Sequence, residues 1–172
     1  VAGVEYRPGE KRLAALLAKH GRGLEAAQAL ADHIALQKGA TRFDLELSVD
    51  ENPADVNTCE CLTAPDELIF LLAEALRRGL PLTHVAPNFG IEKETDYRCP
   101  GGLEELEPRV RTLCAVASEF GVMLDCHSGD DLSKQTRRVI GRATAGNIHF
   151  KISPSLQVLF GEVVHLLAPE LF

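Results

Sequence analysis

The sequence lacks the long apolar runs that would place it in a membrane. No window approaches the roughly 18 consecutive apolar residues that a membrane helix needs, and no signal segment of basic, apolar and small residues opens the chain. We therefore expect no membrane partner and a cytoplasmic location. The chain begins with Val1 in place of an initiator Met, which indicates a trimmed N-terminus or part of a longer protein.

Sequence motifs of three common enzyme classes are also missing. No GxGxxG follows a predicted strand, and neither GxxxxGK[ST] nor GxSxG occurs, which argues against nicotinamide-dependent, nucleotide-phosphate and serine-hydrolase chemistry. Positive charge is scarce as well. The formal net charge of -7 at pH 7 repels phosphate backbones, so we expect no nucleic-acid partner.

Cysteine pairs with the CxxC spacing of a zinc ribbon or a redox motif are absent. The number of cysteines is odd, and we expect all of them to be reduced thiols, as is usual in a cytoplasmic protein. These cysteines are Cys59, Cys61, Cys99, Cys114 and Cys126.

What the sequence does contain is a regular alternation of strands and helices. Apolar residues recur at helical spacing over residues 9–38, with a break at Gly21 and Gly23, which predicts two N-terminal helices. Residues 43–49 alternate apolar and polar as a strand does. Further strands are predicted at 82–86, 122–126 and 147–152, and helices at 64–78, 103–120, 131–142 and 155–167.

This alternation implies parallel strands joined by right-handed crossovers, in a doubly wound sheet or a barrel. The 172 residues fall short of the roughly 250 of a complete eight-unit barrel. The predicted fold class is α/β with repeated βα units and parallel strands, forming a partial or complete TIM-type barrel. We expect a single domain over residues 1–172, with two helices in 9–38 and four βα units in 42–168, as part of a larger barrel.

Polar clusters follow all four predicted strands, at the edge where parallel α/β folds carry their active sites. Each cluster alone is also explained as a solvated loop, but four together favour one shared site. The clusters contain Asp50 and Glu51, then Glu92 and Lys93, then His127, Ser128 and Asp131, and finally His149 and Lys151.

Two histidines are candidate ligands for a divalent metal. His127 ends a buried apolar strand, and His149 points to the strand face opposite Ile148 and Phe150. A structural core histidine is the alternative reading of each. With a carboxylate such as Asp50, they would form a catalytic metal set that leaves positions open for substrate. The other histidines are interpreted as structural or surface residues: His20, His33, His84 and His165.

Several short motifs between residues 42 and 165 resemble the tagaturonate epimerase family, in the family's order and at about its spacing. They are the run 44–51 (DLELSVDE), Thr63-Ala64-Pro65, Arg77-Arg78-Gly79, the run 86–90 (APNFG) with Glu92-Lys93 and Asp96-Tyr97, His127-Ser128-Gly129 with Asp131, and His149-Phe150-Lys151. Two positions depart from the family pattern, which usually has Lys where Leu132 stands and Arg where Asn88 stands.

The resemblance implies a divalent-metal-dependent isomerase that interconverts the sugar acids tagaturonate and fructuronate. The inverted carbon is two bonds from the ketone, so simple enolisation does not explain the reaction, and we expect a retro-aldol/aldol-type step with Zn²⁺, Mn²⁺, Co²⁺ or Ni²⁺. The expected roles are metal binding by His127, His149 and Asp50, acid/base catalysis by Glu51 and Glu92, and substrate binding by Lys93, Ser128, Asp131 and Lys151.

Other functions stay open at this stage. A metal-dependent aldolase acting on a keto-sugar acid is the nearest alternative, and a noncatalytic ligand-binding barrel fragment is the next. Exposed barrel edges would also favour association, so a homo-oligomer is a possible state.

Overall fold

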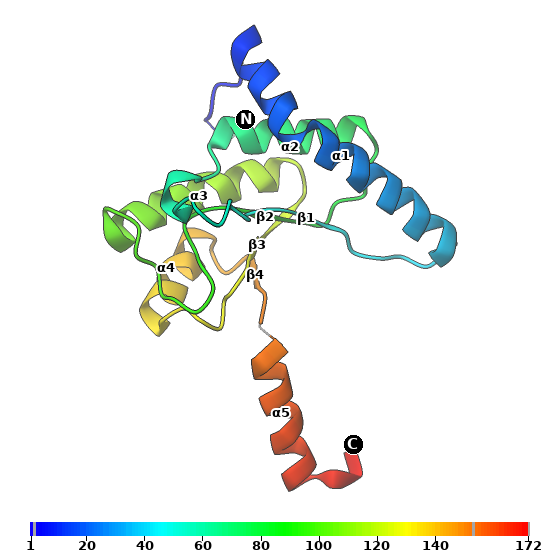
Figure 1. The fold of residues 1–172 in the computed structure, drawn as a ribbon, viewed down its shortest axis with the longest axis vertical. Helices are drawn as coiled ribbons and strands as arrows, with labels where there is room; N and C mark the ends of the chain where they lie inside the picture. The colour runs from blue at the N-terminus through cyan, green and yellow to red at the C-terminus, as the bar shows by residue number, and fades with distance from the viewer. Residues whose placement is uncertain (2, 153, 172) are drawn as a thin grey trace.

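Four parallel strands in sequential order form the centre of the computed structural model, which describes residues 1, 3–152 and 154–171. The confirmed α/β fold consists of repeated βα units (Figure 1). The elements are α1 (Glu10–Lys38), β1 (Glu46–Val49), η1 (Thr58–Glu60), α2 (Pro65–Arg77), β2 (His84–Pro87), α3 (Gly102–Glu119), β3 (Met123–Cys126), α4 (Lys134–Ala143), β4 (Ile148–Phe150), α5 (Pro154–Leu167) and η2 (Pro169–Leu171).

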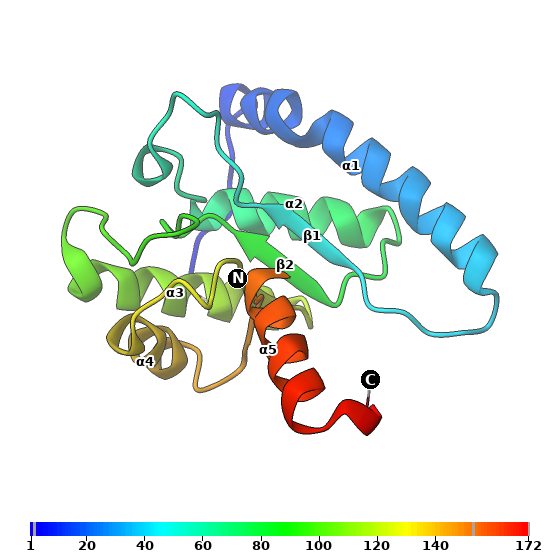
Figure 2. The same cartoon turned by 60° about the horizontal axis from the view of Figure 1, so that its bottom comes forward.

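Helices α1 to α4 cover one face of the sheet (Figure 2). Val85 and Leu124 belong to a core that joins β2 and β3 to α2, α3 and α4, and the apolar residues of β1 pack against a second core between α1 and α2. A doubly wound sheet would carry helices on both faces. Sequential parallel strands with their helices on one side are instead the arrangement of successive units of an α/β barrel.

The sheet is an open arc within the described residues. There β1 pairs only with β2, and β4 pairs only with β3. Helix α5 extends away from the sheet (Figure 1) and exposes many large apolar side chains, among them Phe160 and Leu167. No helix among the described residues is both long and apolar enough to cross a membrane.

The N-terminal region forms one helix, so the prediction of two helices in 9–38 is wrong. Helix α1 runs without a break through Gly21 and Gly23. Each glycine costs a helix about 1 kcal/mol relative to alanine, but His20 and Leu24 are buried on either side of this segment. Packing of these two residues therefore outweighs the local preference for a break.

Two of the five cysteines form a disulfide, so the prediction of reduced thiols throughout is wrong. Cys59 of η1 and Cys99 of the β2–α3 loop are bonded, whereas Cys61, Cys114 and Cys126 are free. The pair is 40 residues apart in sequence. The loops that follow β1 and β2 meet because their strands are neighbours, and no local spacing signals this contact.

The two positions that depart from the family pattern are buried parts of the scaffold. Leu132 is 2% exposed and belongs to the core under α3 and α4. Asn88 is also 2% exposed, and its side-chain amide donates to the backbone oxygens of Thr58 and Cys61 while its side-chain oxygen accepts from Gly90 N. Asn88 thus fastens the η1 segment to the end of β2.

Candidate functional site

The sheet face turned away from α1–α4 carries polar side chains that the alternation of the strands selects. The apolar residues of β1 pack against the helices, so Glu46 and Ser48 point the other way. On β3 and β4 the same alternation turns Asp125 and His149 to this inner face, because their apolar neighbours belong to the helix-side core. Four acidic, hydroxyl and imidazole groups from three strands therefore share one surface.

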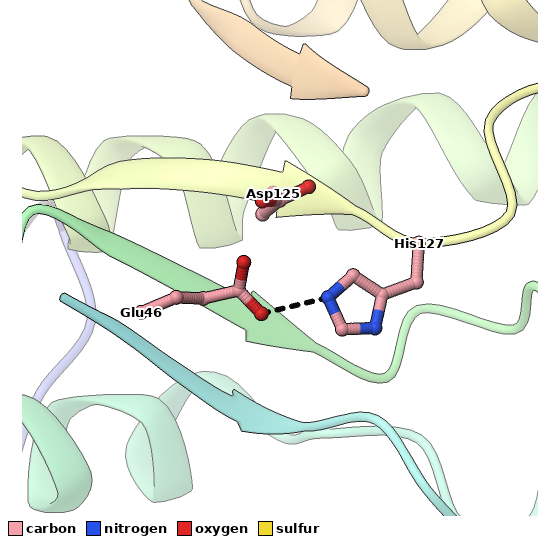
Figure 3. Close-up of side chains that lie close together, drawn as sticks. All are labelled: Glu46, Asp125 and His127. Carbon is pink, nitrogen blue, oxygen red and sulfur yellow. Dashed lines mark hydrogen bonds and ion pairs between the residues drawn. The ribbon is translucent and has the colours of Figure 1, made fainter. Parts of the chain in front are cut away.

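Ala86 allows groups from β1 and β3 to meet across the strand between them. It is paired in register with Ser48 and is 1% exposed. Because its side chain is a single methyl group, His127 at the end of β3 reaches over β2. Its Nε2 lies 2.7 Å from Oε1 of Glu46 (Figure 3), and its Nδ1 lies 2.9 Å from Oδ2 of Asp50. The imidazole is held between two carboxylates.

Asp125 is a buried carboxylate with one unsatisfied oxygen. The residue is 1% exposed, and its Oδ2 lies 2.7 Å from Nδ1 of His149. Its Oδ1 has no hydrogen-bond partner among the described residues. A buried acceptor without a partner costs about 1–3 kcal/mol, and this cost makes the position a candidate for binding a cation or a donor group.

The protonation of the cluster reflects its crowded carboxylates. Burial and the neighbouring carboxyl of Asp125 raise the pKa of Glu46 above its usual value, although His127 opposes the shift. The hydrogen bond to Asp50 raises the pKa of His127 against the effect of burial, and Glu46 adds to the increase. For Asp50, burial acts upward, but the hydrogen bonds of His127 and Ser48 outweigh it and lower the pKa.

Three of these side chains match the donor set of a divalent metal. Glu46, Asp125 and His127 each offer one ligand atom, and these atoms lie within 4.8 Å of one another (Figure 3). Carboxylate oxygen and imidazole nitrogen suit Zn²⁺, Mn²⁺, Co²⁺ and Ni²⁺. A cation there would satisfy Oδ1 of Asp125 and offset the two adjacent carboxylates, so the residues present fit such an ion.

A cavity of about 920 Å³ opens beside the cluster, within the size range of small-molecule sites. Its polar side includes Glu46, Ser48 and His127, and Leu156 and Leu159 of α5 contribute apolar surface. A smaller cavity of about 210 Å³ adjoins it at the loops after β1 and β2. Both cavities lie at the C-terminal ends of the strands.

This geometry is accompanied by a clear family match. The model of the tagaturonate epimerase family matches residues 1–172. The chain belongs to the tagaturonate epimerase family. Among curated members, the tagaturonate/fructuronate epimerase of Thermotoga maritima is 32% identical over 133 residues, which are 76% of this chain and 26% of that protein.

Solved structures of a tagaturonate epimerase family member have the same fold. The glycerol-complexed fructuronate-tagaturonate epimerase of Cohnella laeviribosi aligns with a TM-score of 0.74 at 22% identity, over 99% of this chain and 33% of that chain. Its native crystal structure aligns with a TM-score of 0.61 at 27% identity, over 84% of this chain and 29% of that chain. This chain spans about a quarter of the curated relative and about a third of the solved chains.

The three residues that the sequence predicts as metal ligands lie close together, but only one of them belongs to the cluster of Glu46, Asp125 and His127. His127 belongs to the three-residue ligand set. Asp50 contacts His127 at Nδ1, and His149 contacts Asp125 at Oδ2. Each of the latter two therefore touches a candidate ligand. Their own binding of metal remains a prediction.

The predicted catalytic and substrate residues line the two cavities. Glu51 and Lys93 line both and are 3.4 Å apart, from Oε1 to Nζ. Glu92 lines only the smaller cavity and pairs with Arg98 at 2.5 Å. Ser128, Asp131 and Lys151 line the larger cavity.

Asp131 also has a structural contact that the sequence did not indicate. Its Oδ2 accepts the backbone N–H of Glu94 at 2.8 Å, and Glu94 has a left-handed backbone with φ of 62°. The β2–α3 loop is thereby held against the loop after β3. Substrate binding by Asp131 remains a prediction beside this contact.

Sequence reasoning missed Glu46 and Asp125, the two carboxylates of the ligand set. Both lie within strands, whereas the polar clusters that the sequence shows lie at and beyond the strand ends. The signal was nevertheless present, because Glu46 is on the same strand face as Ser48, and Asp125 is two residues before His127. An acid in the middle of a buried apolar strand needs a partner, and that criterion would have identified Asp125.

Proposed function

We propose that this chain carries the metal-binding part of a tagaturonate/fructuronate epimerase active site. The observation that supports it most is the convergence of Glu46, Asp125 and His127 around the unsatisfied Oδ1 of Asp125. The curated relative is named as an enzyme with both sugar acids as substrates. Because this chain is the equivalent of only part of that relative, the complete reaction is a proposal for the protein to which these residues belong.

The cluster supplies the ligands in this proposal, and the loops supply the substrate contacts. A bound divalent cation would stabilise negative charge that develops on substrate oxygens during a retro-aldol/aldol-type step. Lys93 after β2 and Lys151 after β4 both line the larger cavity and provide positive charge for the carboxylate of the hexulosonate.

Glu51 is the better candidate for the acid/base group. Its side chain is 77% exposed and lines both cavities. Glu51 pairs with Lys93 at 3.4 Å, whereas Glu92 pairs with Arg98 at 2.5 Å, is only 27% exposed and lines only the smaller cavity. A group that exchanges protons with substrate needs access to it, and this requirement favours Glu51.

Metal analysis and calorimetry test the proposal directly. Metal-free protein is titrated with Mn²⁺, Co²⁺, Ni²⁺ and Zn²⁺, and fructuronate formed from tagaturonate is followed by anion-exchange chromatography. We expect about one cation per chain, and loss of binding in Glu46→Gln but not in Glu104→Gln, an exposed acid on α3.

The outcomes separate the proposed functions. Epimerised product with bound metal supports the epimerase. Metal with release of a free aldehyde from the sugar acid would favour the aldolase instead. Absence of both metal binding and product would contradict the proposal and leave a noncatalytic barrel segment, whose association state is then measured by light scattering.

A further inference from the structure

A chain of contacts leads from Ser48 on β1 to the imidazole of His127. The hydroxyl of Ser48 donates to Oδ1 of Asp50 at 2.5 Å. The other oxygen of Asp50, Oδ2, lies 2.9 Å from Nδ1 of His127, and Nε2 on the far side of the ring lies 2.7 Å from Glu46. Both oxygens of Asp50 are therefore engaged, one by the hydroxyl and one by the ring.

We propose that Ser48 is a positioning residue for the metal site: through Asp50 it fixes the orientation of the His127 ring, so that Nε2 faces Glu46 and Asp125. This inference rests on the proposed metal site and deepens it. It assigns Asp50 to the support of a ligand, and it gives Ser48 a role that its presence in the cavity wall does not by itself suggest.

The sequence of β1 explains why Ser48 suits this role. Strand alternation places Glu46 and Ser48 on the same face, and Asp50 follows directly after the strand ends. Strand β1 therefore carries the candidate ligand Glu46 and also Ser48, which binds Asp50. Asp50 in turn contacts the candidate ligand His127. A hydroxyl at position 48 leaves Asp50 few alternative rotamers, because one carboxylate oxygen is already bound.

The orientation of His127 needs such support. The ring enters from the end of β3 and reaches across the sheet to Glu46 of β1 and to Asp50 just after it. Rotation of the ring by 180° about its Cβ–Cγ bond would place carbon atoms where the two nitrogens lie, and the bonds to Asp50 and Glu46 oppose it. Metal-bound histidines commonly have their second nitrogen fixed by a carboxylate, and loss of that partner typically weakens metal affinity 10–100-fold.

A matched pair of substitutions separates the hydroxyl from the shape of the side chain. Ser48→Thr keeps the hydroxyl, whereas Ser48→Val has nearly the same shape as threonine without it, and both β-branched residues suit a strand. Ser118→Ala, an exposed site on α3, is the control. Metal affinity is measured by calorimetry with Zn²⁺ or Mn²⁺ in the absence of any sugar acid, so that a contact between Ser48 and substrate has no influence.

We expect Ser48→Val to weaken metal binding about tenfold, near the lower end of the range for supporting residues. Ser48→Thr should stay within about threefold of wild type, and Ser118→Ala should not differ from it. Equal affinities for Ser48→Val and wild type would overturn the inference.

A second measurement applies even if the protein binds no metal. Imidazole ¹⁵N and ¹H resonances of metal-free protein report whether the Nδ1 proton of His127 is held in a hydrogen bond. We expect a slowly exchanging Nδ1 proton in wild type and Ser48→Thr, and a rapidly exchanging one in Ser48→Val. Failure of metal binding with this pattern intact would refute the proposed function but keep the positioning role. An unchanged resonance in Ser48→Val would refute the positioning role itself.

Discussion

Two regions of the molecule contain a glutamate paired with a histidine at the same distance, but the charged groups around the two pairs differ. At the contact between α1 and α2, Oε1 of Glu67 lies 2.7 Å from Nε2 of His20. On the inner face of the sheet, Oε1 of Glu46 lies 2.7 Å from Nε2 of His127. The geometry of the two pairs is alike, so the difference between the regions comes from the groups around them.

Cationic groups surround Glu67. Lys19 Nζ lies 2.7 Å from its Oε1, and Arg12 approaches its Oε2 at 3.9 Å. The side chain is 6% exposed, and although burial acts upward, the bonds of His20 and Lys19 lower its pKa to about 2. This acid is fully compensated, and the contact joins two helices.

Carboxylates surround Glu46 instead. Asp125 lies beside it and raises its pKa together with burial, and Asp50 occupies the other nitrogen of His127. Glu46 and Asp50 thus share the imidazole of His127, Asp125 pairs with His149 through one oxygen, and its other oxygen is buried without a partner among the described residues. A compensated pair stabilises the fold, whereas an excess of acid creates a place for a ligand of positive charge.

The largest expected effect is that of Asp125→Asn, which should change metal affinity but not the free energy of unfolding. Asp125→Asn keeps the shape of the side chain but removes its charge, so we expect metal affinity to fall at least about 100-fold, more than for a supporting residue. The free energy of unfolding of metal-free protein should not fall, because the lost oxygen had no partner. Calorimetry and urea denaturation measure the two quantities.

Glu67→Gln is the matched control for Asp125→Asn. It should leave metal affinity unchanged and lower the free energy of unfolding. If Asp125→Asn instead destabilised the metal-free protein as Glu67→Gln does, the two clusters would both be structural and the comparison would fail.

The next effect concerns the disulfide that ties the loops beside the site. Removal of the Cys59–Cys99 bond, which closes a segment with a sequence separation of 40, should lower the free energy of unfolding by about 2–4 kcal/mol. The double variant Cys59→Ala/Cys99→Ala and reduced wild type should agree in urea denaturation. Cys114→Ala, a free cysteine on α3, serves as the control.

Measuring metal affinity before and after reduction of the Cys59–Cys99 bond tests whether the ligand set depends on the disulfide. Glu46, Asp125 and His127 lie on or directly after strands, and Asn88 still fastens the η1 segment to β2. We therefore expect reduction to change metal affinity less than threefold. A loss of metal binding on reduction would show that the ligand set depends on the loops.

The alternation of strands and helices was predictable because each element carries its own periodicity. Residues 122–126 predicted a strand, and β3 covers Met123–Cys126. The continuity of α1 was not predictable from local preference, because it depends on His20 meeting Glu67 from α2. The Cys59–Cys99 bond likewise depends on the neighbourhood of two loops rather than on spacing.

Half of the site followed from the same reasoning. Polar residues after strands drew attention to Asp50 and His127, which lie together in the structure. The contribution of Glu46 depends on His127 crossing a neighbouring strand, and Ala86 makes that crossing possible. Such a contact between β1 and β3 requires the order of the strands, which a single sequence does not give.

The smallest expected effect is the pH dependence of the compensated pair. The pKa of Glu67 falls from 4.5, the value of an unperturbed glutamate, to about 2 in the folded protein, so the stability that this shift contributes is fully present above pH 4.5 and is lost as pH falls toward 2. By proton linkage, the free energy of unfolding has lost about 1 kcal/mol of this contribution at pH 4 and about 2 kcal/mol at pH 3. In urea denaturation, the difference in unfolding free energy between wild type and Glu67→Gln should narrow by these amounts below its value at pH 7. A difference that stays constant down to pH 3 would mean that Glu67 is not held as a compensated anion, and the contrast with the inner face would then rest on Asp125 alone.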